Sequence, residues 1–390
     1  MSGQVVSLGC RLNIAESEAI SGFLAGGTPT VVVNSCAVTA EAVRQSRRAV
    51  RRLRRENPEA RLVVTGCAAT IELDAFAGMP EVDAVVPNAD KLKPEVWTEN
   101  VAPSAPVLDS RHTRAFVPVQ NGCDHACTFC IIPQGRGSSV SLETADVIAA
   151  IARHEGVNEV VLTGVDVTSW GADLPTAPKL GDLIAAILRA FPALPRLRLS
   201  SLDGVEIDPL LFELITQEPR VMPHIHLSLQ SGNDMVLKRM KRRHSRRDAI
   251  DLVQRMKARR PEIAIGADLI AGFPTETPEM HADNVSVVRE CAVVHGHVFP
   301  YSPRPGTPAA RMPQVDPVLV KERAAEVRAE VATQRSAWLR SLLGTPAQVL
   351  AERDGTGHAG HFATYRVPQG TPVGSLVVVA PTKIVEGILE

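Results

Sequence analysis

The sequence has few aromatic residues, no long apolar run and almost no net charge. Phe, Trp and Tyr make up 4% of the 390 residues, so a large platform for stacking nucleic-acid bases is not expected. No apolar run could span a bilayer, and the N-terminal MSGQVVSLGCRL lacks the pattern of a secretory signal. The formal net charge is −1, so contact with nucleic acid must come from local basic patches. We therefore expect a cytoplasmic protein.

Cysteine is also scarce, and its distribution is informative. The chain has seven cysteines, and in a cytoplasmic protein these are more readily metal ligands than disulfide partners. Six of them form two groups of three. Cys291 stands outside both groups and is expected to be a buried, inert thiol. The length predicts two or three domains, at about 100–200 residues each.

Residues 122–136 read GCDHACTFCIIPQGR and contain Cys123, Cys127 and Cys130 in the spacing C-x3-C-x2-C. A structural zinc site normally takes four protein ligands, and so does a fully protein-ligated iron–sulfur cluster. Three cysteines can hold three irons of a 4Fe–4S cluster and leave the fourth iron open to a small molecule. The alternative is a loop of incidental or zinc-binding cysteines.

This loop resembles the three-cysteine motif of the radical S-adenosylmethionine (SAM) superfamily. The resemblance implies that Cys123, Cys127 and Cys130 are catalytic, and that the open iron chelates the amino and carboxylate groups of SAM. Reduction then splits SAM into methionine and a 5′-deoxyadenosyl radical. An external low-potential electron donor, such as a flavodoxin or ferredoxin, would be required, because the chain shows no flavin or nicotinamide motif.

The other three cysteines each follow a short β-branched run. QVVSL precedes Cys10, TVVVN precedes Cys36 and RLVVT precedes Cys67, with helical patterns over residues 16–24 and 40–56 between them. Alternating strands and helices predict a parallel sheet, which residues 82–86 would extend. Ligands bind at the carboxyl edge of such sheets, so we expect the three cysteines to converge there as a second metal site. The alternative is three buried core cysteines.

The segments LGCRLNIAESE, VNSCAVTAEAVRQSRR and VTGCAA narrow the resemblance to the methylthiotransferases. They are most similar to the branch that acts on N6-threonylcarbamoyladenosine in tRNA. The resemblance implies two 4Fe–4S clusters, the second of which carries or receives the inserted sulfur. It also implies a sulfur donor and two SAM molecules per turnover, one giving a methyl group and one giving the radical.

The predicted fold is α/β in three parts. Residues 1–100 form a flavodoxin-like parallel-sheet domain, residues 101–114 a linker, and residues 115–325 a partial (β/α)6 barrel with strands near 116–119, 159–163, 196–200, 224–229, 264–269 and 297–299. A helix over residues 326–343 then leads to a small β-barrel over residues 344–390. By resemblance this last part is a TRAM-like module, although Arg353, Arg366 and Lys383 are its only fixed positive charges.

Polar and glycine residues recur at the carboxyl ends of the barrel strands. By resemblance, five of them lie in segments that line the SAM pocket: Gly164, Asp166, Ser201, Gln230 and Asp268. SAM needs carboxylate or amide acceptors for its ribose hydroxyls and backbone groups for its adenine. Taken singly, each residue is more readily a turn residue or a satisfied core group, and it is their recurrence at one rim that indicates a binding site.

Two arginine-rich runs, within residues 44–61 and 238–260, make contact with the anticodon stem-loop of tRNA a reasonable expectation. Their alternative is a solvated helix face. The predicted function is insertion of a methylthio group at C2 of N6-threonylcarbamoyladenosine, at position 37 of tRNA. Two alternatives use the same chemistry, on N6-isopentenyladenosine or on an aspartate of a ribosomal protein. A third, of another class, is a non-catalytic RNA-binding protein with structural zinc.

Overall fold

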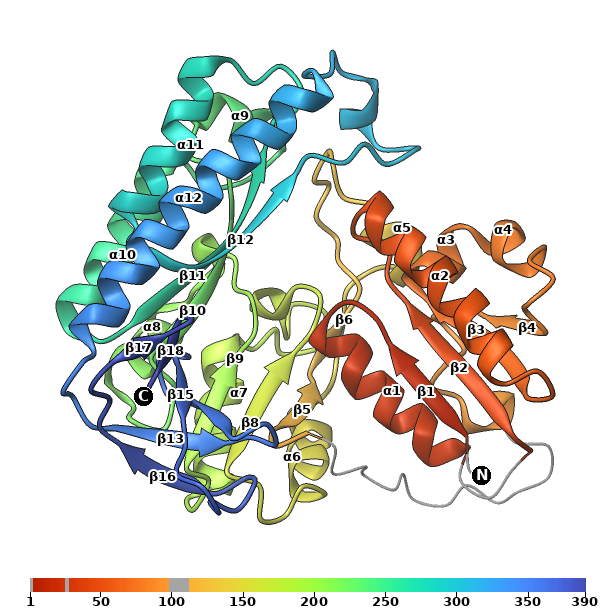
Figure 1. Ribbon diagram of the computed structural model, residues 1–390, viewed down its shortest axis with the longest axis horizontal. Coiled ribbons are helices and arrows are strands. Elements are labelled where there is room, and N and C mark those ends of the chain that lie inside the picture. The colour runs from red at the N-terminus through yellow and green to blue at the C-terminus, as the bar shows by residue number, and fades with distance from the viewer. Residues whose placement is uncertain (1–2, 25–27, 98–111) are drawn as a thin grey trace.

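The computed structural model describes residues 3–24, 28–97 and 112–390 (Figure 1). The expected linker at residues 101–114 lies almost wholly outside these ranges. None of the described helices is both long and apolar enough to cross a bilayer.

The N-terminal part is a four-stranded parallel sheet. Its strands are β1 (Gln4–Ser7), β2 (Thr30–Ser35), β3 (Arg61–Gly66) and β4 (Ala84–Val86), which lie side by side in chain order. The parallel sheet is confirmed, but the expected flavodoxin-like arrangement is wrong. That fold has the order 2-1-3-4-5, whereas here the chain starts at one edge and every strand adds beside the last.

Helices cover both faces of this sheet. Ile20 of α1 (Arg11–Phe23) packs with Val32, whereas Val50 of α2 (Ala40–Glu56) packs with Val31 and Val33. Neighbouring residues of a strand point to opposite faces, so the two helices lie on opposite sides. α2 begins where the Thr39 hydroxyl accepts a hydrogen bond from the Ala42 amide (3.1 Å), an N-cap. Short helices α3 (Cys67–Ile71), α4 (Leu73–Ala77) and η1 (Pro94–Val96) complete this part.

The central part contains six parallel strands in two groups. β5 (Ala115–Pro118), β8 (Glu159–Thr163) and β9 (Arg196–Leu199) form one sheet, and β10 (His224–Gln230), β11 (Ala264–Ala271) and β12 (Val293–Pro300) form the other. The isolated bridges Leu197–Val221 and Leu202–Leu227 join the two sheets. All six predicted strands are present. Within the described residues β5 and β12 do not pair, so the arrangement is an open half-barrel.

Helices surround the outer face of these strands. They are α6 (Thr144–Ala152), α7 (Leu180–Ala190), α8 (Pro209–Gln217), α9 (Asp234–Arg239), α10 (Arg246–Arg259) and α11 (Pro278–Glu290). The long α12 (Pro317–Ser341) packs on β12 and α11 (Figure 1). Short elements lie between them: β6 (Gln120–Asn121), β7 (Val140–Ser141), α5 (Ile132–Arg136), η2 (Val167–Ser169), η3 (Gly204–Glu206) and η4 (Pro308–Arg311).

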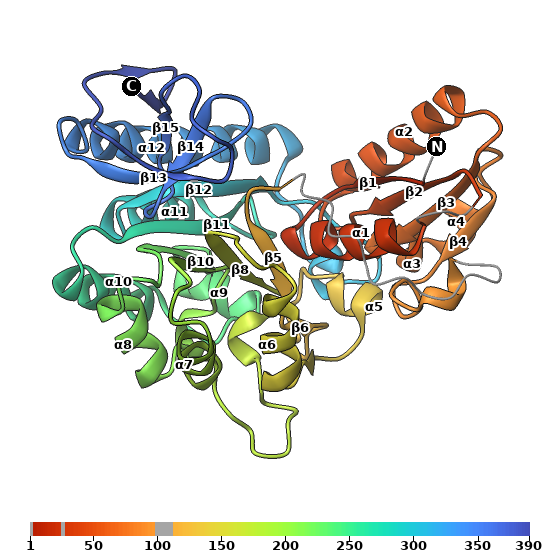
Figure 2. The same ribbon diagram turned by 90° about the horizontal axis from the view of Figure 1, so that it is seen from below.

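The C-terminal part is a small six-stranded sheet in the order β16-β13-β14-β15-β18-β17. Its strands are β13 (Ala347–Ala351), β14 (Thr356–Ala359), β15 (Thr364–Arg366), β16 (Leu376–Val379), β17 (Ile384–Val385) and β18 (Ile388–Leu389). Arg196 and Arg198 of β9 donate hydrogen bonds to the carbonyls of Gln348 (2.6 Å) and Gly360 (3.0 Å). The sheet therefore rests against the half-barrel (Figure 2).

Candidate site at the two cysteine groups

The loop that carries Cys123, Cys127 and Cys130 is held by backbone contacts on both sides. It begins at Gly122, whose φ is +72° and where a Cβ would lie 1.8 Å from the Ser138 carbonyl oxygen, so only glycine fits. The Cys123 amide then donates to the Gly137 carbonyl (3.1 Å), and the Thr128 amide donates to the Met240 carbonyl (3.2 Å). The irregular loop is thus fixed in shape although it has no regular secondary structure of its own.

The chemistry of these thiols fits an iron–sulfur cluster. Burial raises the pKa of Cys123 to about 12 and that of Cys130 to about 11, whereas iron binds thiolates. A bound cationic metal offsets this cost of deprotonation. Donors also face the sulfurs: the His125 amide lies 3.4 Å from Cys123 Sγ, and Arg242 Nη1 lies 3.6 Å from Cys127 Sγ.

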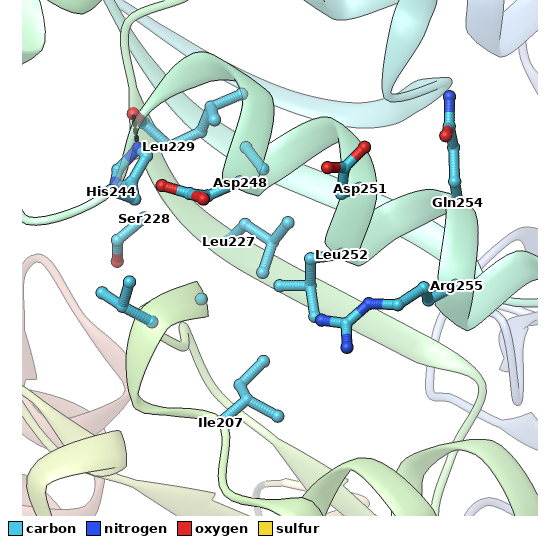
Figure 3. Close-up of a pocket in the computed structure, with 13 residues that line it drawn as sticks. Ile207, Leu227, Ser228, Leu229, His244, Asp248, Asp251, Leu252, Gln254 and Arg255 are labelled. Carbon is cyan, nitrogen blue, oxygen red and sulfur yellow. Dashed lines mark hydrogen bonds between the residues drawn. The ribbon is translucent and has the colours of Figure 1, made fainter.

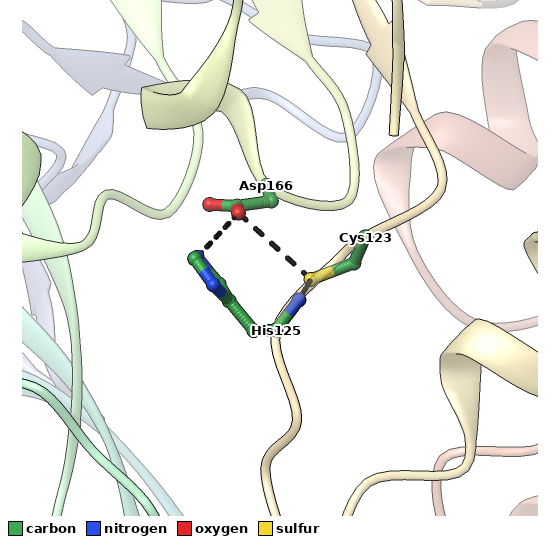
Figure 4. Close-up of side chains that lie close together, drawn as sticks. All are labelled: Cys123, His125 and Asp166. Carbon is green, nitrogen blue, oxygen red and sulfur yellow. Dashed lines mark hydrogen bonds and ion pairs between the residues drawn. The ribbon is translucent and has the colours of Figure 1, made fainter. Parts of the chain in front are cut away.

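A charged group borders the loop on the side of β8 (Figure 4). His125 Nε2 lies 2.7 Å from Asp166 Oδ2, and that oxygen lies 3.8 Å from Cys123 Sγ. Asp166 and Glu206 accept hydrogen bonds from His125 and raise its pKa to about 10, so the imidazole is cationic at neutral pH. The Asp166 amide in turn donates to Gln120 Oε1 (2.8 Å), which fixes the turn after β8.

The structure brings two of the five predicted SAM-pocket residues to the cysteine loop and places the other three at the ends or within other strands of the half-barrel. Gly164 and Asp166 lie beside the cysteine loop, and a Cβ on Gly164 would be 2.8 Å from the Gln120 carbonyl oxygen. Asp268 lies instead in β11, where its Oδ1 is 3.0 Å from His226 Nε2 and 3.1 Å from His297 Nδ1. Ser201 follows β9, and Gln230 ends β10 with a positive φ of 65°.

The three N-terminal cysteines come together at the carboxyl edge of the N-terminal sheet, as expected. Cys10, Cys36 and Cys67 follow β1, β2 and β3. Gly9 has a φ of +99°, and a Cβ there would lie 2.8 Å from Cys36 Sγ, so the backbone before Cys10 is packed against Cys36. Burial raises the pKa of Cys36, and charges on Cys67 and Cys10 act in the same direction.

Arg136, at the end of α5, links the two cysteine groups. Its Nε lies 3.2 Å from Cys67 Sγ, while its Nη1 and Nη2 donate to Glu16 at 2.8 Å and 2.9 Å. Nη2 also donates to Asn13 (2.6 Å). Burial acts to lower the pKa of Arg136, but Glu16 outweighs it and the pKa is raised. A guanidinium from the central part is therefore built into the N-terminal site.

Other contacts support this link. Lys91 Nζ lies 2.6 Å from Glu16, and Asn88 Nδ2 donates to the Gly135 carbonyl (2.6 Å) while lying 3.6 Å from Cys67 Sγ. Ile131, next to Cys130, is part of the N-terminal core, and Cys67 is one of the charges that raise the pKa of Cys130. The two cysteine groups thus lie on either side of α5.

The sequence alone assigned no role to Arg136, His125, Glu16 or Asn13, and it predicted only RNA contact for the run that contains Arg242. The sequence did offer one indication: His125 lies between Cys123 and Cys127, and Arg136 ends the same motif. The partners Asn13 and Glu16 lie three and six residues after Cys10 in LGCRLNIAESE, but nothing in the sequence paired them with Arg136.

A separate cavity lies away from this site. It has a volume of about 550 Å³ and lies between β10, η3 and α10, lined by Ile207, Leu227, His244, Asp248, Leu252 and Arg255 among others (Figure 3). None of the seven cysteines lines it.

The two arginine-rich runs differ in what they contact. On α2 the side chains of Arg44, Arg48, Arg51, Arg52 and Arg55 are exposed. In the second run, Arg242 pairs with Asp203 (2.9 Å), Arg246 donates to the Gly232 and Asp283 carbonyls, and Arg260 donates to the Val221 carbonyl. Much of the second run is therefore used inside the fold.

Comparison with known proteins gives concordant matches. Residues 117–286 match the radical SAM superfamily, and residues 3–87 match the uncharacterized protein family UPF0004. The chain is 41% identical to a Rickettsia prowazekii (strain Madrid E) protein named threonylcarbamoyladenosine tRNA methylthiotransferase MtaB, over 99% of this chain and 96% of that protein. A protein of the same name from Thermotoga maritima is 30% identical, over 90% of this chain and 86% of that protein.

A solved structure shares the fold. The radical S-adenosylmethionine methyltransferase TsrM from Kitasatospora setae aligns with a TM-score of 0.55, over 83% of this chain and 81% of that chain, at 16% identity.

Proposed function

The chain belongs to the radical SAM methylthiotransferases of the MtaB type, and from this we propose that it inserts a methylthio group at C2 of N6-threonylcarbamoyladenosine at position 37 of tRNA. The observation that carries the proposal is the approach of two cysteine groups to α5. Relatives that match this chain over most of their length are named threonylcarbamoyladenosine tRNA methylthiotransferases, which supports the same reaction class here. The alternative of a non-catalytic zinc protein is set aside, because the family consists of enzymes.

We assign Cys123, Cys127 and Cys130 to a 4Fe–4S cluster with one open iron, and Cys10, Cys36 and Cys67 to a second cluster. The C2–H bond of adenine is unactivated, and the chemistry supplied at the first site is reductive cleavage of SAM to a carbon radical able to break that bond. Iron–sulfur potentials reach about −700 mV, low enough for this task with an external electron donor. A separate sulfur donor supplies the second site.

The protein's own groups would bind and orient the reactants. Asp166, with His125 cationic beside it, can accept hydrogen bonds from the SAM ribose. The turn at Gly164 brings backbone groups close to the cysteine loop. Ser201, Gln230 and Asp268 remain proposed SAM-pocket residues, although Asp268 is already engaged by His226 and His297.

The division of the chain into domains is proposed on the same family membership. We assign residues 1–100 to the methylthiotransferase domain, residues 115–325 to the radical SAM core, residues 326–343 to a connecting helix and residues 344–390 to a TRAM-like module. Because tRNA is the substrate, the enzyme would act in the cytoplasm. The exposed arginines of α2 are the stronger candidate for phosphate contact because five of them lie on one helix, whereas Arg366 and Lys383 of the C-terminal sheet share Glu390 (3.4 and 3.1 Å).

Cysteine variants test the division of labour. We expect Cys123→Ala, Cys127→Ala and Cys130→Ala to abolish SAM cleavage, measured anaerobically as 5′-deoxyadenosine. We expect Cys10→Ala, Cys36→Ala and Cys67→Ala to retain cleavage but lose methylthio transfer to tRNA. Cys291→Ala is the matched control and should retain both. Equal loss of cleavage in all six variants would contradict separate roles.

The substrate is tested by mass spectrometry of tRNA nucleosides from a deletion strain. Loss of the methylthio form of N6-threonylcarbamoyladenosine supports the proposal. An unchanged nucleoside profile refutes it. Loss of the methylthio form of N6-isopentenyladenosine instead would identify that nucleoside as the substrate.

A further inference from the structure

The inside of the half-barrel is polar, unlike the packed apolar interior of a closed (β/α) barrel. Along each strand, alternate residues belong to the apolar core under the outer helices, for example Leu197 and Leu199, or Ile225 and Leu227. The residues between them must point inward. They include Glu159, Thr163, Arg196, Arg198, His224, His226, Gly266, Asp268, His295 and His297.

Some of these inward polar atoms have no partner. Within the described ranges, Thr163 Oγ1 and both ring nitrogens of His224 are buried without a hydrogen bond. Burial lowers the pKa of His224 well below its usual value and that of His295 to about 3, so neither ring carries charge at neutral pH. The inner face of the half-barrel is thus a polar surface on which arginines and carboxylates carry most of the charge.

Arginine is in excess there. Glu159 is paired with three guanidinium groups, those of Arg114 (2.8 Å), Arg196 (3.4 Å) and Arg198 (2.7 Å). Arg114 has a second carboxylate partner in Glu352 (2.6 Å). Two carboxylates therefore balance three arginines before Arg11 is counted.

Arg11 adds a fourth cation. It is the first residue of α1, which packs against β5, and its guanidinium carbon lies 5.6 Å from the centre of the Phe362 ring. The same ring has Arg198 at 4.7 Å and Arg114 at 5.5 Å. The Arg11 side chain therefore reaches from the N-terminal part to the arginine group of the half-barrel.

Arg11 lacks the carboxylate partner that Arg114, Arg196 and Arg198 have. In the part of the chain that the structure describes, no hydrogen bond or ion pair of its guanidinium is found. The guanidinium groups of Arg198 and Arg114 lie over the same Phe362 ring, so two like charges are close to that of Arg11. A partly buried guanidinium that has no carboxylate partner and lies near two other guanidinium groups favours the binding of an anion.

We propose that Arg11 binds the carboxylate of the substrate's threonylcarbamoyl group, an inference that rests on the proposed function. A planar guanidinium fork matches a carboxylate in two parallel hydrogen bonds. Arg11 directly follows Cys10, so its backbone belongs to the N-terminal cysteine site while its guanidinium lies in the half-barrel. An isopentenyl group carries no charge and leaves Arg11 unpaired. Arg11 is thus a specificity-determining residue that favours an anionic adenosine.

The test compares two RNA ligands with the reconstituted holoenzyme under anaerobic conditions. One is an anticodon stem-loop carrying N6-threonylcarbamoyladenosine, and the other is the same RNA with that carboxylate converted to a methyl ester. We expect the wild type to bind the acid roughly 10- to 100-fold more tightly than the ester. Arg11→Gln should bind both alike, whereas Arg189→Gln, which changes an exposed arginine on α7, should retain the preference.

Two further measurements locate the effect. Iron content and 5′-deoxyadenosine formation should be unchanged in Arg11→Gln. If Arg11→Gln needs a higher SAM concentration but still prefers the acid RNA, the proposal is overturned and Arg11 is a SAM-binding residue. If Arg11→Gln fails to hold its iron, Arg11→Lys replaces it. Lysine keeps the positive charge but lacks the planar pair of N–H donors. The Arg11→Lys variant should therefore prefer the acid RNA over the ester less strongly than the wild type does, and an unchanged preference overturns the proposal.

The outcomes separate the inference from the function on which it rests. A wild type that does not methylthiolate the acid stem-loop refutes the proposed function. A wild type that converts it, but whose preference for the acid is absent or survives in Arg11→Gln, refutes only the role of Arg11.

Discussion

At the scale of single residues, Arg136 is the most consequential contact in the protein. Its side chain is buried, and it contacts Cys67, Glu16 and Asn13 of the N-terminal part while its backbone belongs to α5. Lys91 shares Glu16 with it. A buried ion pair is often close to neutral for stability as a whole, yet removing one member leaves the other charge uncompensated.

We expect Arg136→Gln to lower the free energy of unfolding by about 3–5 kcal/mol, because Glu16 would keep only Lys91. The variant should also hold less iron and sulfide at Cys10, Cys36 and Cys67, since the donor beside Cys67 is lost. Urea unfolding and iron and sulfide analysis measure the two effects. Arg153→Gln, at an exposed position, is the control. An Arg136→Gln protein with wild-type stability and iron content would show that the link is dispensable.

At the scale of elements, short turns rather than long helices set the positions of the cysteines. Each N-terminal cysteine directly follows a strand or its closing glycine, and Cys123 follows the β6 strand and Gly122. Gly9, Gly66 and Gly122 all have positive φ angles and closely approached backbones. The sulfur positions therefore depend on glycine conformations that other residues rarely adopt.

Two glycine substitutions distinguish the cost of a positive φ angle from the cost of a steric clash of the added Cβ. Gly122 and Gly156 have similar φ angles, +72° and +80°, but a Cβ at Gly122 meets the Ser138 carbonyl oxygen at 1.8 Å, while a Cβ at Gly156 has nothing within 4 Å. Gly156→Ala should cost only the strain of a left-handed alanine, about 1–2 kcal/mol. Gly122→Ala should in addition displace the cysteine loop and abolish SAM cleavage. Comparable iron content and cleavage in the two variants would rule out this role for Gly122.

At the scale of the whole molecule, the half-barrel is used at both ends. The cysteine loop follows β5 and β6, and the Asp166 turn follows β8, at the carboxyl side. The C-terminal part instead contacts Arg196, Arg198 and Arg114, at or near the starts of β9 and β5. Glu159, at the start of β8, joins these arginines, so one buried carboxylate helps to hold two parts of the protein together.

The pH dependence of stability should report on Glu159. Burial acts to raise its pKa, but Arg198 and Arg114 outweigh burial and lower the pKa to about 2. A lowered pKa means that the ionised group stabilises the fold above its unfolded pKa of about 4.3, and that this contribution is lost as pH falls toward 2. The shift corresponds to about 3 kcal/mol at neutral pH.

We therefore expect Glu159→Gln to be least stable relative to the wild type near pH 7, with the difference shrinking between about pH 4.3 and pH 2. Urea unfolding followed by circular dichroism across this range measures it. Glu155→Gln, at an exposed site four residues earlier, should differ little from the wild type at any pH. A stability difference for Glu159→Gln that does not change with pH would contradict the assignment.

The sequence determined the elements and the grouping of the chemistry. Hydrophobic runs and turn residues predicted the parallel N-terminal sheet, the six central strands and the small C-terminal sheet, because these patterns are local. The strand-end positions of Cys10, Cys36 and Cys67 predicted their convergence, because parallel strands share one carboxyl edge.

Only the tertiary structure decided what depends on long-range contacts. The N-terminal strands lie in the order β1-β2-β3-β4. Asp268 contacts His226 and His297, and Arg242 of the second arginine run is paired with Asp203 inside the fold. The tertiary structure also joined Arg136 to Glu16, 120 residues away, and brought Arg11 to Arg198. These pairings are set by the packing of separate elements, and a residue's local pattern carries no information about a partner that only packing brings near.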